Sequence, residues 1–162
     1  FLALHLMRGF TLPDRKPRPG TMEAVEMLRE LAKDFPQHPG VHHYIIHGWE
    51  GGSFARDAWG SSERYPQLVP NIPHALHMPG HIWSQTGRFA DAVKSFTDAA
   101  VNELGYLKAD PLMGSGHHGH NVHYLSTANA FSGNHEEAMK AALSLLEFKE
   151  NPREAASIDN YR

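Results

Sequence analysis

The sequence predicts an all-α protein in which antiparallel helix pairs stack into a solenoid, and two observations support this prediction. First, similar segments begin at Pro39 and Pro73, 34 residues apart, and the pattern returns at Gly119. Second, apolar residues within each segment recur three or four positions apart, which is the spacing of one helix face. One helix pair cannot bury its apolar face alone, so we expect the pairs to stack as a right-handed superhelix with a concave inner surface.

The first unit is expected over about residues 5–38, one period before Pro39. Within it, Met22–Lys33 is predicted to be a helix because apolar residues at positions 22, 25, 28 and 31 share one face. The first half of the unit, before this helix, contains three prolines, and proline interrupts a helix. The outermost N-terminal helix pair is therefore expected to be irregular.

The second and third units are expected over about 39–72 and 73–106. In the third unit, Leu76 and Trp83 belong to the first predicted helix, and Gly87 supplies the turn. The second helix has a stripe of residues suited to burial against a neighbour: Phe89, Ala92, Phe96 and Ala99.

The fourth unit is expected over about 119–152, after an insertion of about 104–118. The insertion contains Asp-Pro and Gly-Ser-Gly, and both of these short sequences favour a loop. The fourth unit repeats the pattern of the third at Val122, Leu125, Gly133, Ala138, Ala142 and Leu145. All four units form a single expected domain over 1–162, and because the chain opens inside an apolar stretch at Phe1 we expect it to be part of a longer protein.

These residues and their period resemble the tetratricopeptide repeat over most of 22–150. The strings HPGVHHYIIH, PHALHMPGHIW and HNVHYL are also similar to a histidine-rich subgroup of bacterial tetratricopeptide proteins, to which we attach no activity. The resemblance implies that the concave wall is formed by the first helix of each unit. It also implies which positions face the groove, namely the second, fifth, ninth, twelfth and thirteenth of each unit.

Composition excludes several classes of function. A net charge of -3, with 15 Lys and Arg scattered among 18 Asp and Glu, offers no basic surface for nucleic acid. No apolar run approaches the roughly 20 residues that a membrane-spanning helix needs, and no targeting segment is visible, so we expect a soluble chain without membrane partners. The absence of cysteine excludes thiolate ligands and nucleophiles but leaves the cellular compartment open.

Histidine is the unusual feature of this sequence, with 13 among 162 residues. In the second, third and fourth units it occupies seven of the fifteen groove positions implied by the resemblance. Helical spacing independently puts these residues on shared faces, since positions three, four and seven apart are neighbours on a helix. The seven are His43, His47, His74, His77, His81, His120 and His123.

Clustered imidazoles are typical of a site for Zn, Cu, Fe or Ni. We therefore predict a transition-metal ion in the groove, and the predicted ligands are His43, His47, His77, His81, His120 and His123. Glu50, three residues after His47, is predicted to be a further ligand or a catalytic general base. His74, Ser84 and Thr127 are predicted to line the groove.

Two other interpretations remain open at this stage. The groove could instead bind a peptide or protein, with the histidines as pH-sensitive contacts, or the repeats could form a plain assembly scaffold. With a metal ion bound, hydrolytic and oxidative chemistry are both possible, so whether the chain is an enzyme stays open. His42 is predicted to be a core residue, while His117 and His118 belong to a loop that either folds over the groove or is solvated.

Overall fold

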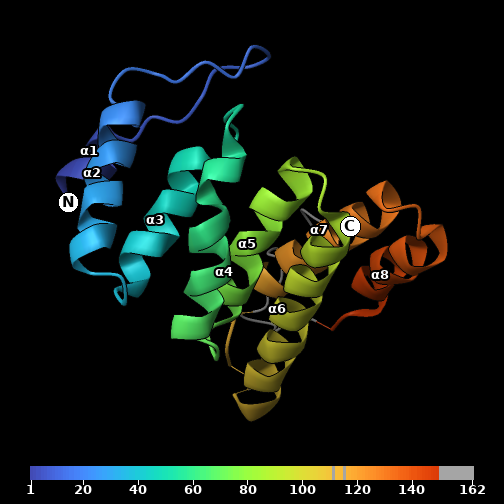
Figure 1. Ribbon diagram of the computed structural model, residues 1–162. Helices are drawn as coiled ribbons and strands as arrows, with labels where there is room; N and C mark the ends of the chain where they lie inside the picture. Colours follow the sequence, from blue (N-terminus) through green and yellow to red (C-terminus); the bar gives the residue numbers. More distant parts are fainter. Residues whose placement is uncertain (111, 115, 150–162) are drawn as a thin grey trace.

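The computed structural model describes residues 1–110, 112–114 and 116–149, and within them the chain is helical and forms no β-strand (Figure 1). The helices follow one another with short connections, apart from one long segment between the first two. Their bounds are α1 (Leu2–Leu6), α2 (Thr21–Asp34), α3 (Pro39–Trp49), the 3₁₀ helix η1 (Ala55–Ala58), α4 (Trp59–Leu68), α5 (Pro73–Gln85), α6 (Phe89–Ala109), α7 (Gly116–Phe131) and α8 (His135–Glu147).

Local sequence explains where the helices begin and turn. Pro39 and Pro73 each occupy the first turn of a helix, where the missing N–H is not needed and the fixed φ angle suits the helix. Gly87 and Gly133 connect the helices of their pairs with φ angles of +79° and +85°, which favour glycine. Helix α2 covers the predicted segment Met22–Lys33 and extends it by one residue at each end.

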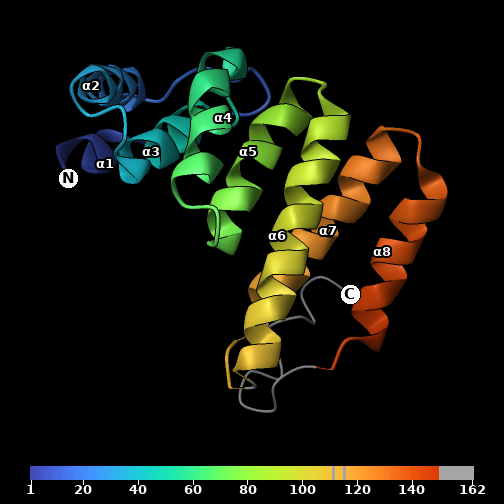
Figure 2. The same ribbon diagram turned by 60° about the horizontal axis from the view of Figure 1, so that its bottom comes forward.

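The helices form a linear, curved array in which each packs mainly against its neighbours in the sequence (Figures 1 and 2). Helix α3 also contacts α5, so the first helices of successive pairs lie side by side. One continuous apolar core runs from Ala3 to Ala128, and a smaller cluster of Ala100, Val122 and Leu145 joins the last helices. The chain is thus an all-α solenoid, as predicted.

Two connections differ from the sequence-based expectation. The loop predicted over 104–118 is much shorter, because α6 continues to Ala109 and α7 already begins at Gly116. Buried contacts of His118 and Gly119 stabilise this helix start in spite of the glycines around it. In the second unit, a turn and η1 precede α4, so its second helix begins late, at Trp59. Residues 150–152 of the fourth predicted unit lie outside the described residues.

None of the helices in the described residues combines the length with the apolar character that crossing a membrane requires.

Candidate metal centre

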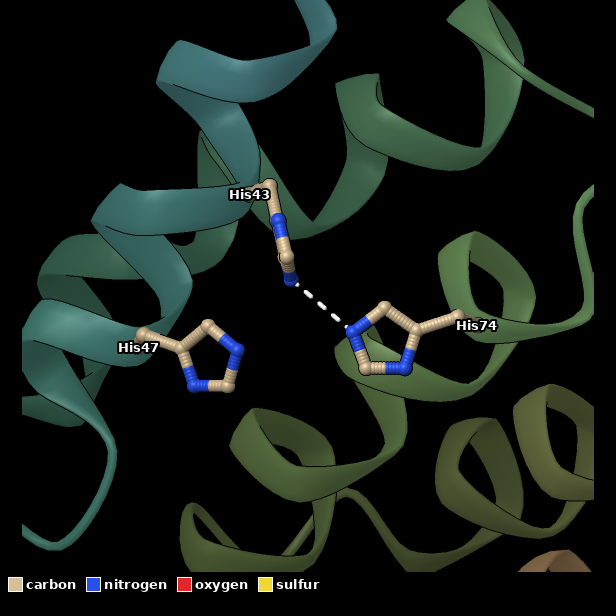
Figure 3. A group of neighbouring side chains, drawn as sticks. All are labelled: His43, His47 and His74. Carbon is tan, nitrogen blue, oxygen red and sulfur yellow. Dashed lines mark hydrogen bonds between the residues drawn. The ribbon is translucent and has the colours of Figure 1, made fainter. Parts of the chain in front are cut away.

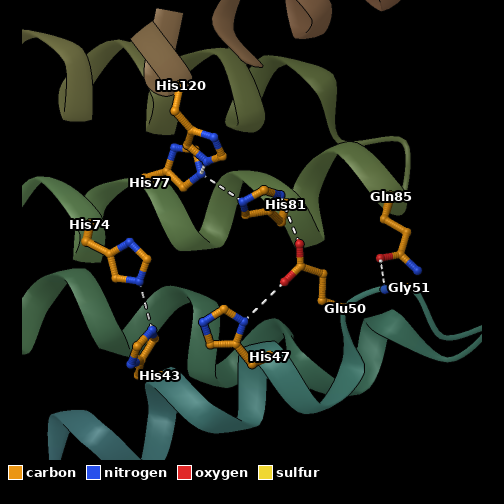
Figure 4. A network of polar contacts seen from close by, with 9 residues as sticks. All are labelled: His43, His47, Glu50, Gly51, His74, His77, His81, Gln85 and His120. Atoms are coloured by element: carbon orange, nitrogen blue, oxygen red, sulfur yellow. Dashed lines mark hydrogen bonds and ion pairs between the residues drawn. The ribbon is translucent and has the colours of Figure 1, made fainter. Parts of the chain in front are cut away.

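Six histidines from α3, α5 and α7 come together as two groups of three, on the side where the predicted groove lies (Figure 4). In each group one ligand atom of every ring lies within 4.8 Å of the others. We call the more buried group the inner triad and the less buried group the outer triad. The inner triad is His77, His81 and His120, and the outer triad is His43, His47 and His74.

The inner triad brings three ring nitrogens together in a buried place. Nε2 of His77 lies 2.7 Å from Nε2 of His81 and 3.1 Å from Nε2 of His120. Nitrogens around a four-coordinate ion, with bonds of about 2.0–2.1 Å, are about 3.3 Å apart, so small shifts would give a coordination site. His77 is fully buried, and its Nδ1 has no hydrogen-bond partner among the described residues.

The outer triad also brings three imidazole rings together, in a less buried place. Figure 3 shows its three side chains. Nε2 of His43 and Nε2 of His74 lie 2.9 Å apart, and the ring of His47 stands 4.7 Å from that of His43, centroid to centroid. The phenol ring of buried Tyr65 stacks on His43 at 5.1 Å and 16°. This stacking restricts the rotation of His43 and keeps its Nε2 directed at α5.

Both triads follow one rule of the repeat. With the units starting at Pro39, Pro73 and Gly119, each triad takes the fifth and ninth residues of one unit and the second residue of the next. The fifth and ninth residues are one helical turn apart and share a face. The second residue of the next unit meets them across the α3–α5 contact in the outer triad, and His120 of α7 reaches His77 of α5 in the inner one. Each triad therefore lies at the interface between two successive units.

Glu50 connects the two triads. One carboxylate oxygen lies 3.2 Å from Nδ1 of His47 and the other lies 3.2 Å from Nδ1 of His81 (Figure 4). When the carboxylate accepts both N–H groups, each ring carries its proton on Nδ1 and presents the lone pair of Nε2. Carboxylates hold the metal-binding histidines of many proteins in this way. The position of Glu50 thus favours the Nδ1–H tautomer in one member of each triad.

The turn after α3 holds Glu50 in place. Glu50 itself has extended backbone, and Gly51 follows with a φ angle of +86°, which favours glycine. The amide of Gln85, at the end of α5, accepts the N–H of Gly51 at 2.9 Å and donates to the carbonyl of Gly52 at 2.6 Å. This two-point clamp ties the turn to the helix that carries His81.

The electrostatic environment favours the neutral form of five triad histidines, namely His43, His74, His77, His81 and His120. Burial, reinforced by neighbouring imidazoles, lowers the pKa of His43, His74 and His120 to about 4 and that of His77 to about 2. Burial alone would raise the pKa of the Glu50 carboxyl, but the hydrogen bond of His47 and the influence of His81 hold that pKa below its usual value. Neutral imidazoles beside a carboxylate are the protonation states that metal coordination needs.

Aromatic side chains of α6 and α7 pack against the inner triad. The ring of Phe96, on α6, lies 4.9 Å from the ring of His77, and Tyr124 lies 4.6 Å from the ring of His81. Phe96 fits because α5 carries Gly80 at the crossing, where a Cβ atom would lie only 2.4 Å from the phenyl ring. The α5–α6 contact therefore sets the depth of His77 in the groove.

Sequence reasoning missed a polar network at the start of α7. The carboxylate of Glu103 is buried, accepts the Asn121 amide at 2.6 Å and lies 3.4 Å from Nδ1 of His117. The His117 ring lies 5.6 Å from that of His74 and 5.8 Å from that of His120, between the triads. The sequence did carry a signal for this network. Glu103 lies on the buried, mostly apolar face of α6, and a carboxylate there needs a buried partner.

The predicted residues do not all meet at one site. His74, predicted only to line the groove, is a member of the outer triad, whereas His123 is exposed and lies outside both triads. Ser84 is half-buried, and the hydroxyl of Thr127 donates to the carbonyl of His123. Glu50 contacts Nδ1 of His47 and of His81 rather than their Nε2 atoms, and its role as a ligand or general base stays a prediction.

The core prediction for His42 is confirmed. His42 is buried, with Nδ1 3.1 Å from the Ser61 hydroxyl and Nε2 2.9 Å from the carbonyl of Pro36. Both ring nitrogens of this structural histidine have ordinary partners. The contrast with His77, whose Nε2 faces two other imidazoles, distinguishes the triads from core histidines.

Comparisons with known proteins bear on the fold. No protein-family model matches the chain, and no curated protein sequence does either. Solved structures do match, among them the crystal structure of MamA, with a TM-score of 0.63 and 14% identity. That match covers 88% of this chain and 77% of the MamA chain. MamA contains tetratricopeptide repeats, and at this identity the likeness shows a tetratricopeptide-like fold alone.

Proposed function

We propose that the protein binds a transition-metal ion in its groove, with Nε2 of His77, His81 and His120 as ligands. The observation that carries this proposal is the convergence of the three nitrogens at 2.7 and 3.1 Å. The absence of cysteine and the imidazole ligands favour Zn(II), Cu(II), Ni(II) or Fe(II).

Hydrogen bonding alone is a poor explanation for the inner triad. When Nδ1 of His81 carries its proton toward the Glu50 carboxylate, 3.2 Å away, Nε2 of His81 is an acceptor. One proton on Nε2 of His77 can then serve only one of its two short contacts. A metal ion accepts the lone pairs of all three rings at once, which relieves this conflict.

Three imidazoles leave a coordination position for water or substrate, as in catalytic zinc sites. An ion held in this way lowers the pKa of its bound water to about 7 and can activate it. Metal-dependent hydrolysis is therefore the first class of reaction to screen, followed by oxidative chemistry if the bound metal is redox-active.

Elemental analysis of protein purified without a histidine tag tests the proposal. His120→Ala removes one half-buried ligand and is expected to lose about one equivalent of metal relative to the wild-type chain. His123→Ala, three residues along the same helix and outside both triads, is the matched control and is expected to keep the metal. Failure of the wild-type chain to bind any of Zn(II), Cu(II), Ni(II) and Fe(II) would rule the proposal out.

A partner-binding scaffold is the second candidate, favoured by the tetratricopeptide-like fold. The histidine rings contact one another across the groove, so a peptide would have to displace them in order to lie there. A chain that binds no metal, yet binds a peptide in a manner sensitive to His120→Ala, would favour this candidate.

A further inference from the structure

The outer triad reproduces the ring-to-ring distances of the inner triad, although the angles between equivalent rings differ. Between the fifth and ninth residues of the unit, the ring centroids are 4.7 Å apart in the outer triad and 4.6 Å apart in the inner one. From the fifth residue to the second of the next unit they are 4.9 and 4.7 Å apart, and from the ninth they are 6.3 and 6.2 Å apart. The same positions of the repeat therefore give nearly the same ring-to-ring distances in both triads.

We propose that the groove holds two metal ions, one in each triad, an inference that rests on the proposed function of the inner triad. Nε2 of His43 and Nε2 of His74 stand 2.9 Å apart, as the equivalent nitrogens of His77 and His120 stand 3.1 Å apart. Both triads consist of imidazoles alone, so both take the same class of ion, with Zn(II) and Cu(II) foremost.

Glu50 links the two proposed sites, because it contacts a histidine of each triad. Its two oxygens lie at equal distances, 3.2 Å, from Nδ1 of His47 in the outer triad and Nδ1 of His81 in the inner triad. Two divalent ions in neighbouring sites repel each other, and the negative charge between their ligands reduces that repulsion. The same carboxylate orients one imidazole toward each ion.

The repeat rule also sets the number of ions. One unit further along, the fifth residue is His123 but the ninth is Thr127, whose hydroxyl donates to the main chain. A hydroxyl is a poor substitute for an imidazole toward these metals. In the described residues the rule is therefore satisfied twice, and we expect two ions and not three.

Native mass spectrometry of the full chain tests this inference after metal removal and reconstitution with Zn²⁺ alone. The wild-type chain is expected to bind about two zinc ions. His74→Ala and His120→Ala are each expected to keep about one, because each variant breaks one triad only. The control His123→Ala is expected to bind as the wild type does, and circular dichroism establishes that each variant is folded.

The possible results separate this inference from the proposed function. A wild-type chain that binds one zinc ion, unaffected by His74→Ala but lost in His120→Ala, would overturn the second site and leave the inner one standing. A chain that binds no zinc, and none of the other three metals, would overturn both. Two ions in the wild type and one in each single-triad variant would support the two-ion centre.

Discussion

At the scale of single residues, the role that we propose for the Glu50 carboxylate is to orient histidines of both triads. It lies 3.2 Å from Nδ1 of two imidazoles that belong to different triads, and a proton on each Nδ1 would leave the lone pair on Nε2 of His47 and of His81. A sequence alone suggests a ligand or a base for a glutamate near histidines. The distinction depends on which ring nitrogen the carboxylate contacts, which only the structure reveals.

Glu50→Gln tests the orienting role. The glutamine amide has one oxygen and one NH₂ group, so it can accept the Nδ1 proton of only one of the two histidines. The other ring then meets a donor and is expected to move its proton to Nε2. We expect zinc affinity, measured by competition with a chromophoric chelator, to fall about 10–100-fold at one triad or both.

Glu30→Gln provides the matched control for that measurement. Glu30 lies on α2, exposed and paired with Lys33, away from both triads. Zinc affinity of this variant is expected to equal that of the wild type. Unchanged affinity in Glu50→Gln as well would show that the carboxylate does not orient the ligands.

The lowered pKa values predict an acid-labile metal-free protein. Histidines in the unfolded chain have a pKa of about 6.5, whereas burial lowers the pKa of His43, His74 and His120 to about 4 in the folded chain. Between these values the unfolded chain binds more protons, so the free energy of unfolding is undiminished above pH about 6.5 and falls as the pH drops toward about 4.

Urea titrations in the presence of EDTA measure this effect at several pH values between about 7.5 and 4. The groups that face these rings are the other imidazoles, including His47, His81 and His117, and the Glu50 carboxylate. Because Glu50 attracts protons to its neighbours, Glu50→Gln is expected to steepen the loss. A free energy of unfolding that does not change over this range would contradict the burial of neutral imidazoles.

At the scale of elements, α5 contributes histidines to both triads and depends on close contact with α6. Gly80→Ala is expected to destabilise the protein by about 1–3 kcal/mol, because the added methyl overlaps the buried ring of Phe96. Thermal unfolding measures the change. Gly105→Ala is the control, since a Cβ at this glycine of α6 meets no atom within 4 Å, and it should leave stability unchanged or slightly raised. Equal melting temperatures for both variants would argue against the close crossing.

Helix starts could be predicted well where the sequence carries local signals. Pro39 and Pro73 indicate two of these starts, because proline is favoured in the first turn of a helix. The start of α7 could not be found in this way, since Gly116 and Gly119 normally indicate a loop. There, burial of His118 against Phe148 and of Asn121 against Glu103 outweighs the local preference.

At the scale of the whole molecule, the period of the repeat allowed the solenoid and the histidine face to be predicted. The grouping into triads could not be predicted, because it depends on how far one unit is displaced along the next. That displacement brings His74 to His43 and His120 to His77, and it leaves His123 at the surface. Periodicity identifies a face, whereas tertiary packing determines which side chains on it meet.

Each triad draws its histidines from two successive units, and this arrangement gives the proposed metal centre a mechanical consequence. In a repeat array, each unit contacts only its neighbours, so an unassisted chain can lose structure step by step from its ends. An ion in the outer triad joins α3 to α5, and one in the inner triad joins α5 to α7. With both ions bound, three units become a single cooperative body, and the metal would set the stiffness of the solenoid as well as its chemistry.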